Sequence, residues 1–263
     1  MAISLKDLRK EQATEPPRIV IYGPEGMGKT TLASEFPNPV FLQVEKGTPA
    51  GLTLDSFGHL TTFGQVMEGI ESLYDEDHEF DTVVVDSLSE LERLVFAEVC
   101  SRNQWATIEK PGYGKGYKEA DYVWQEFVEG LNALRRDKNM AVVLIAHAEI
   151  TRFDDPQTSS YSRYDLSLHD RASAIISREV DAILLVKQDA TVKQDDPKAS
   201  QGVGTRKRAD GGETRWIYCQ GRPAFAAKNR YDMPDKVMFT RGQGFDALSR
   251  YFPNPGEEHQ AAA

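Results

Sequence analysis

The sequence predicts an α/β fold in which a mostly parallel central sheet carries helices on both faces. The first observation is a short apolar strand over 19–22, which leads through a glycine-rich loop into a helix beginning at Lys29. The second is that the predicted strands 81–86 and 140–146 contain the uninterrupted apolar runs 83–85 and 140–146, which is typical of parallel strands covered on both faces. Because predicted strands and helices alternate along the chain, we expect helical crossovers between parallel strands.

Local signals justify the elements in chain order. Pro37 and Pro39 end the first helix, because proline cannot continue one. Ser87 and Glu90 form a capping box that opens the third helix. Apolar residues of the long helix over 119–137 recur at the spacing of one helix face. The predicted strands cover 19–22, 40–44, 81–86, 140–146, 182–187, 214–219 and 224–227, and the predicted helices cover 29–36, 63–73, 88 onward, 119–137, 172–180 and 245–251.

The length and composition fit one large globular α/β domain or two small ones. The chain has 263 residues, 40% of them hydrophobic and 27% charged, and no apolar run approaches the roughly 18 residues of a membrane helix. Residues 1–10 lack the apolar segment of a secretory signal, so we expect a cytoplasmic protein with no membrane partner. We expect a flexible N-terminal arm over 1–16, a core over 17–252 that contains a flexible excursion at 189–213, and a disordered tail over 253–263.

The net charge of −10 excludes a protein that coats DNA non-specifically, because such a protein presents a basic surface. Any nucleic-acid site is therefore local. We expect it on loops, assisted by bound Mg²⁺ or by neighbouring subunits.

A phosphate-binding loop lies between the first strand and the first helix. Its glycines let backbone N–H groups turn toward a phosphate, and the helix N-terminus adds partial positive charge. Lys29 is expected to reach the β- and γ-phosphates of ATP, and the Thr30 hydroxyl to ligate Mg²⁺. The predicted nucleotide-binding residues are Gly23, Pro24, Glu25, Gly26, Met27, Gly28, Lys29, Thr30 and Thr31.

Three polar residues follow other predicted strands, and the carboxyl ends of parallel strands share one edge of a sheet. Asp86 is a candidate Mg²⁺ ligand, the alternative being a helix-capping aspartate. Glu45 is a candidate general base that activates water, the alternative being a solvated loop glutamate. His147 is a candidate sensor of the γ-phosphate, the alternative being a structural histidine.

A basic pair, Lys228 and Arg230, follows the last apolar segment. In a ring or filament, such a pair can reach a neighbour's γ-phosphate as a catalytic arginine finger. The alternative is a solvated basic turn.

The ordered set of these segments resembles a RecA-type P-loop ATPase core, and in particular the phage-encoded, AAA-type RecA-like proteins of single-strand annealing and recombination. The resemblance covers about residues 17–232 and implies the water-activating role for Glu45 and γ-phosphate sensing for His147. Residues 228–231, Lys-Asn-Arg-Tyr, are similar to the K-N-R-F-G signature of bacterial RadA, although Tyr231 and Asp232 replace its Phe and Gly.

The resemblance also implies two DNA-binding loops, at 110–118 and at about 151–171. Both combine cationic and tyrosine side chains, which suit backbone contact and base stacking, and the alternative is a pair of surface loops. The candidate DNA-binding residues are Lys110, Tyr113, Lys115, Lys118, Arg152, Tyr161 and Arg163.

Three functions remain open from the sequence. The first is a DNA-stimulated ATPase that promotes annealing or exchange of single-stranded DNA as a homo-oligomer, a ring or a filament, in the bacterial host cytoplasm. A single-strand-binding protein is a partner that the resemblance implies. The second is a small-molecule or nucleotide kinase with an arginine-bearing lid. The third is a non-catalytic scaffold that assembles with ATP.

Overall fold

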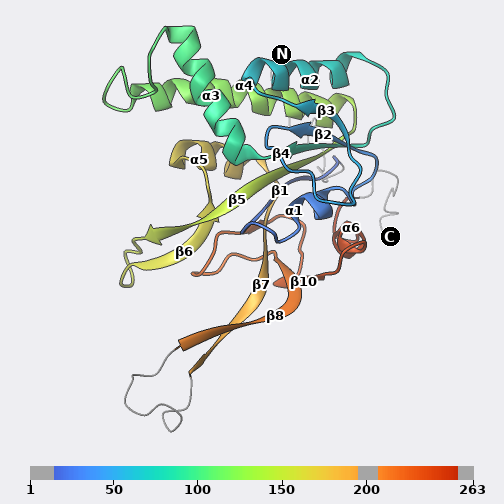
Figure 1. Ribbon diagram of the computed structural model, residues 1–263, viewed down its shortest axis with the longest axis vertical. Coiled ribbons are helices and arrows are strands. Elements are labelled where there is room, and N and C mark those ends of the chain that lie inside the picture. The colour runs from blue at the N-terminus through green and yellow to red at the C-terminus, as the bar shows by residue number, and fades with distance from the viewer. Residues whose placement is uncertain (1–14, 195–206, 254–263) are drawn as a thin grey trace, which may run out of the picture.

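The structure, a computed structural model, describes residues 15–194 and 207–253, and it has a central sheet with helices on both faces (Figure 1). The strands are β1 (Arg18–Gly23), β2 (Pro39–Gln43), β3 (Asp55–His59), β4 (Thr82–Asp86), β5 (Ala141–Phe153), β6 (Tyr161–Leu166), β7 (Ala182–Gln194), β8 (Lys207–Tyr218), β9 (Lys228–Asn229) and β10 (Lys236–Phe239). The helices are α1 (Lys29–Ala33), α2 (Phe63–Asp75), α3 (Leu88–Asn103), α4 (Lys115–Asp137), α5 (Asp170–Glu179) and α6 (Gly244–Ser249).

The strand order is β10-β8-β7-β1-β5-β4-β2-β3, with β6 paired to β5 and β9 paired to β7. The pairs formed by β1, β2, β3, β4, β5 and β7 along this order are parallel. The antiparallel pairs are β7 with β8, β8 with β10, β5 with β6, and β7 with β9. The predicted fold class, a mostly parallel sheet with helices on both faces, is confirmed.

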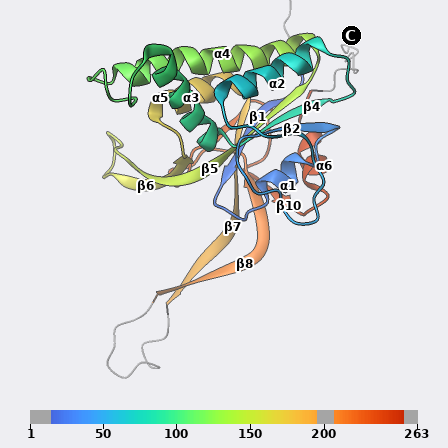
Figure 2. The ribbon, with the colours of Figure 1, turned by 45° about the horizontal axis from the view of Figure 1, so that its top comes forward.

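Two apolar layers fill the faces of the sheet. The larger layer is formed between the sheet and the inner faces of α2, α3, α4 and α5. It includes the Trp124 and Phe127 side chains, which are 1% and 0% exposed. The smaller layer lies under α1 and α6, where Leu32, Phe36 and Phe239 pack together. Figure 2 shows the four helices of the larger layer gathered above the sheet and α1 and α6 beneath it. The apolar runs at 83–85 of β4 and 141–146 of β5 are buried because both layers contact them.

The polar stretch after His147 differs from the predicted long loop. Strand β5 continues to Phe153 and pairs antiparallel with β6, so the segment forms a hairpin closed by residues 154–160. Exposed and half-buried residues follow each other in this hairpin without strict alternation, and none of the strand from 147 to 153 is fully buried. A hairpin of this kind lacks the apolar run that marks the core strands, which is why the sequence concealed it.

Other boundaries also moved. Helix α4 begins at Lys115 instead of 119, because Gly114 caps it in a left-handed conformation and Gly116 packs against the Ile108 carbonyl. The predicted excursion at 189–213 contains the outer halves of β7 and β8, which pair with each other. The predicted strand at 224–227 forms only isolated bridges through Phe225, and β3 and β10 were not predicted. The arm over 1–14, the residues 195–206 and the tail from 254 lie outside the described residues.

Candidate nucleotide site

The phosphate loop joins β1 to α1 at the carboxyl edge of the sheet. Gly26 and Gly28 have φ angles of 72° and 86°, which side chains rarely adopt, and this frees the loop to curl. The Lys29 ammonium donates hydrogen bonds to the carbonyls of Gly23 at 2.9 Å and Pro24 at 3.0 Å. Burial lowers the pKa of Lys29. The negative charges of Asp86, Glu45 and Glu25 act to raise this pKa but do not outweigh the burial. An arriving phosphate would replace these carbonyls as the partner of the amine.

Thr30 and Asp86 meet across the loop. The Thr30 hydroxyl donates to Oδ2 of Asp86 at 2.7 Å. Burial raises the pKa of Asp86 more than this hydrogen bond lowers it, so the ionised carboxylate lacks sufficient compensation in the protein alone.

These two oxygens fit the predicted Mg²⁺ site, because Mg²⁺ uses one or two protein oxygens together with nucleotide phosphates and water. Among the residues that the structure describes, no group of three or more His, Cys, Asp or Glu side chains could hold a metal by itself. The candidate ion site therefore depends on a bound nucleotide to complete its ligands.

Glu45 is held from two sides at the end of β2. The Ser87 hydroxyl donates to its Oε2 at 2.8 Å, and Nε2 of His147 lies 2.8 Å from the same oxygen. Because a carboxylate only accepts, Nε2 carries the proton. Partial burial acts to raise the pKa of Glu45, but the hydrogen bonds from Ser87 and His147 and the Lys29 charge outweigh it and bring the pKa below its ordinary value.

One cavity of about 470 Å³ brings these groups together. Lys29, Thr30, Asp86, Glu45 and His147 all line it, although they come from four different strand ends. The carboxyl ends of β1, β2, β4 and β5 are adjacent in the sheet order, which explains the convergence. Its remaining lining residues are Glu25, Gly26, Gly28, Thr31, Gln43, Lys46, Gly47, Pro49 and Arg215.

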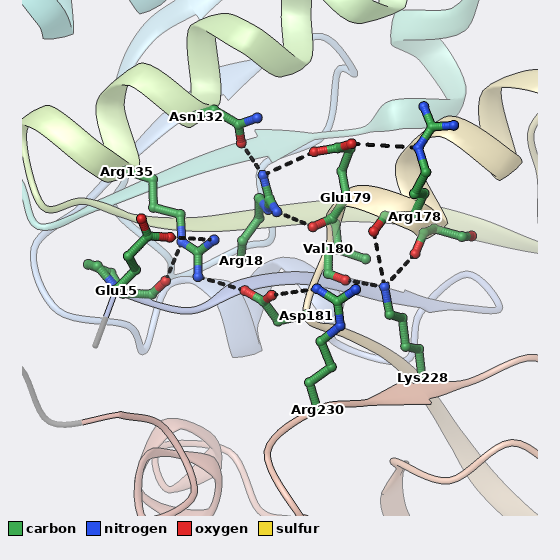
Figure 3. Close-up of polar contacts among 12 residues, drawn as sticks. Glu15, Arg18, Asn132, Arg135, Arg178, Glu179, Val180, Asp181, Lys228 and Arg230 are labelled. Atoms are coloured by element: carbon green, nitrogen blue, oxygen red, sulfur yellow. Dashed lines mark hydrogen bonds and ion pairs between the residues drawn. The ribbon is translucent and has the colours of Figure 1, made fainter. Parts of the chain in front are cut away.

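Lys228 and Arg230 do not join this cavity within one chain. Strand β9 pairs with Ala182 and Ile183 of β7, at the amino edge of the sheet, whereas the phosphate loop is at the carboxyl edge. The Lys228 ammonium donates to three carbonyls at the end of α5, those of Ser177, Arg178 and Val180, at 2.7, 3.2 and 2.6 Å (Figure 3).

Arg230 is tied less firmly. Its Nη1 lies 3.3 Å from Asp181, which also accepts hydrogen bonds from Arg135 and from the Tyr231 hydroxyl. The Arg230 side chain is 55% exposed, compared with 11% for Asp181. Lys228 therefore caps a helix of its own chain, while the guanidinium of Arg230 remains accessible to another molecule.

The first candidate DNA loop is partly helical. Lys115 and Lys118 belong to α4, whereas Lys110 and Tyr113 precede it. The Tyr113 side chain stands 99% exposed at a left-handed turn. This segment therefore presents one free aromatic ring near the start of a helix.

The second candidate segment is the β5–β6 hairpin. Arg163 donates to Asp165 at 2.6 Å and its guanidinium lies 4.1 Å from the centre of the Phe153 ring, while Tyr161 packs beside the same ring. Arg152 pairs with Asp154 at the exposed tip. Neither arginine lines the nucleotide cavity.

Sequence reasoning missed three groups at the site. Ser87, read only as a helix cap, also donates to Glu45, and the Ser89 hydroxyl accepts from the backbone N–H of His147. Their position directly after Asp86 was an available signal. Arg215 lies on β8, far from the motif in the sequence, and nothing in its local pattern marks it.

A sequence model of the AAA domain matches residues 15–231, well over half of the chain. The chain therefore belongs to the AAA-domain family and to the class of P-loop nucleotide-binding domains. No curated protein matches it. Among solved structures, it is similar to one titled "Crystal structure of the RadB recombinase", at 16% identity and a TM-score of 0.46 over 87% of this chain and 90% of that chain.

The family assignment confirms the predicted P-loop class, whereas the phage origin stays a prediction. None of the helices within the described ranges combines the length and apolar character needed to cross a bilayer.

Asp86→Asn should raise the melting temperature of the nucleotide-free protein at pH 7. The raised pKa of Asp86 means that its ionised form opposes folding, and this penalty grows as pH rises from the ordinary carboxyl pKa through the raised folded value. Thermal unfolding would show the gain at roughly 2–4 °C per kcal/mol. The difference should vanish below about pH 3, where the parent carboxyl is mostly neutral in both states. A variant that melts lower at pH 7 would contradict the assignment of Asp86 as an under-compensated carboxylate.

Proposed function

We propose that this chain is an ATPase that binds single-stranded DNA and promotes strand annealing or exchange in recombination as a homo-oligomer. The observation that carries the hydrolytic part is the Glu45 carboxylate, which Ser87 and His147 hold at 2.8 Å each beside the Lys29 loop. A phosphate-binding loop alone supports nucleotide binding. An ionised, oriented carboxylate in the same cavity supports water activation.

In the proposed mechanism, Lys29 exchanges its loop carbonyls for the β- and γ-phosphate oxygens of ATP. Thr30 and Asp86 would hold Mg²⁺, which would supply positive charge to stabilise the transferred phosphoryl group. Glu45 accepts a proton from water as the water oxygen bonds to the γ-phosphorus and the bond from that phosphorus to the β–γ bridging oxygen breaks. The products are ADP and inorganic phosphate, with the proton on Glu45.

His147 is proposed to report the γ-phosphate to the DNA site. It contacts Glu45 and lies on β5, the same strand that continues into the hairpin. From His147 to Phe153 the strand advances by six residue steps, or about 20 Å. A shift at the nucleotide would move the hairpin without any intervening loop.

The DNA proposal is supported by a groove of about 510 Å³ beside the hairpin. Phe153 and Tyr161 line it together with Arg163 and Arg222. Aromatic rings and guanidinium groups are the surfaces on which unpaired bases stack. Both arginines are paired with carboxylates, Asp165 and Asp235, so backbone phosphates would have to exchange with these partners.

The oligomer proposal assigns Arg230 to the neighbour's nucleotide. Its exposed guanidinium, at the sheet edge opposite the phosphate loop, suits a head-to-tail assembly in which one subunit's amino edge faces the next subunit's carboxyl edge. Lys228 would position this segment through its bonds to the end of α5.

Glu45→Gln should lower steady-state ATP turnover by about 10²-fold or more while ATP binding survives, because the amide keeps the shape but cannot accept the proton. Phosphate release measured with and without single-stranded DNA checks this. Glu71→Gln, at an exposed position on α2, is the control. If the parent protein assembles with ATP but shows no turnover, the scaffold alternative replaces the ATPase.

Equimolar mixing of Glu45→Gln and Arg230→Ala subunits should restore about a quarter of parent turnover, because random assembly makes one interface in four complete in both groups. Each variant alone should be nearly inactive. Turnover equal to the mean of the separate variants would show that Arg230 does not act between subunits.

Tyr161→Ala should weaken binding of a labelled single-stranded oligonucleotide by about 5-fold or more, since stacking on one aromatic ring contributes roughly 1–3 kcal/mol. Fluorescence anisotropy at low salt with an ATP analogue measures this. Tyr74→Ala, which removes a half-exposed ring on α2, should bind as the parent does. Equal affinities of parent and Tyr161→Ala would remove the hairpin from the DNA site.

A further inference from the structure

Arg215 lies against the phosphate loop. Its strand, β8, is on the opposite flank of β1 from β5, β4 and β2. A Cβ added to Gly28 would stand 2.9 Å from Nη1 of Arg215 and 3.3 Å from the Phe239 ring. Arg215 and Phe239 are directly opposite each other on β8 and β10, so their side chains share one face of the sheet. The guanidinium also lines the 470 Å³ cavity that contains Lys29.

This guanidinium is half-buried and forms no hydrogen bond or ion pair with any described residue. The carboxylates of the same cavity, Glu25, Glu45 and Asp86, do not pair with it. Elsewhere in the described chain, half-buried arginines such as Arg135 and Arg163 have carboxylate partners. A partly desolvated guanidinium with five free donors favours an anion beside it.

The sheet order indicates which part of the nucleotide Arg215 would meet. Strands β5, β4 and β2 lie on one side of β1. His147 follows the buried part of β5, Asp86 ends β4, and Glu45 follows β2. Strands β7 and β8 lie on the other side, so Arg215 approaches the loop from the flank opposite the water-activating group. The backbone of a phosphate loop cradles the α- and β-phosphates, and Gly28 belongs to that backbone.

We propose that Arg215 binds the α- or β-phosphate of the nucleotide from within the same chain, as a positioning residue that does not contact the γ-phosphate. This inference rests on the nucleotide binding proposed above. It implies that Arg215 contributes equally to ATP and ADP affinity, unlike Glu45, which acts on turnover. A Cβ on Gly28 would crowd this guanidinium, and the positive φ of 86° already disfavours a side chain there.

Titration calorimetry with ADP, AMP, a non-hydrolysable ATP analogue and inorganic tripolyphosphate tests this on the full-length parent, Arg215→Ala and Arg215→Lys. Arg215→Ala should bind ADP, the ATP analogue and tripolyphosphate about 10-fold or more weakly, as expected for lost charge-assisted hydrogen bonds. Arg215→Lys should fall between, because it keeps the charge and loses the planar fork. Turnover at saturating ATP should stay within about threefold of the parent, since chemistry occurs at the other phosphate.

A structural role is distinguished by melting without ligand. Removing an unpaired guanidinium should leave the ligand-free melting temperature unchanged or higher, whereas a packing role would lower it. Arg93→Ala, an exposed arginine on α3, should bind every ligand as the parent does. Unchanged ADP affinity in Arg215→Ala overturns the inference. So does a loss of affinity for AMP and ADP with the tripolyphosphate affinity unaffected, and so does a loss of affinity for the ATP analogue alone.

The two proposals fail separately. A parent that binds ADP but does not hydrolyse ATP contradicts the proposed ATPase and leaves the Arg215 comparison intact. A parent that binds tripolyphosphate but not ADP contradicts nucleotide binding, and the tripolyphosphate affinities still decide whether Arg215 holds phosphate.

Discussion

The arrangement of the site depends on one oxygen, Oε2 of Glu45, which accepts hydrogen bonds from both Ser87 and His147. Ser87 begins α3 and His147 ends the buried part of β5, and both reach this oxygen at 2.8 Å. The contact joins the ends of β2, β4 and β5 and keeps the carboxylate ionised by lowering its pKa. A general base needs this combination of charge, fixed position and access to the cavity.

The same sheet gives the molecule two distinct edges. Its carboxyl edge holds the phosphate loop, Asp86 and Glu45, while its amino edge holds the cluster around Asp181 with Arg135 and Arg230. Strand segments whose apolar residues are buried run between the two edges and separate them. In a head-to-tail assembly, this spacing would place one subunit's Arg230 at the next subunit's nucleotide, and hydrolysis would then be coupled to assembly.

Much of the cavity could be predicted because parallel strands deliver their terminal residues to one edge. Asp86, Glu45 and His147 each follow an apolar run, and a loop of fixed spacing identified Lys29 and Thr30. The rest depended on contacts that sequence patterns do not encode. The β5–β6 hairpin mixes exposed and half-buried residues in no regular period, and its sequence therefore resembles that of a loop. The capping of α5 by Lys228 requires three carbonyls that converge only in the folded chain, and Arg215 meets Gly28 through strands formed nearly 190 residues later.

The most direct test of the central claim is a crystal structure with Mg²⁺ and a non-hydrolysable ATP analogue. We expect Thr30 and Asp86 at the ion, and the Glu45 carboxylate within hydrogen-bond reach of a water in line with the γ-phosphorus. A structure in which Glu45 faces away from the γ-phosphate, or in which the nucleotide avoids the Lys29 loop, would contradict this account.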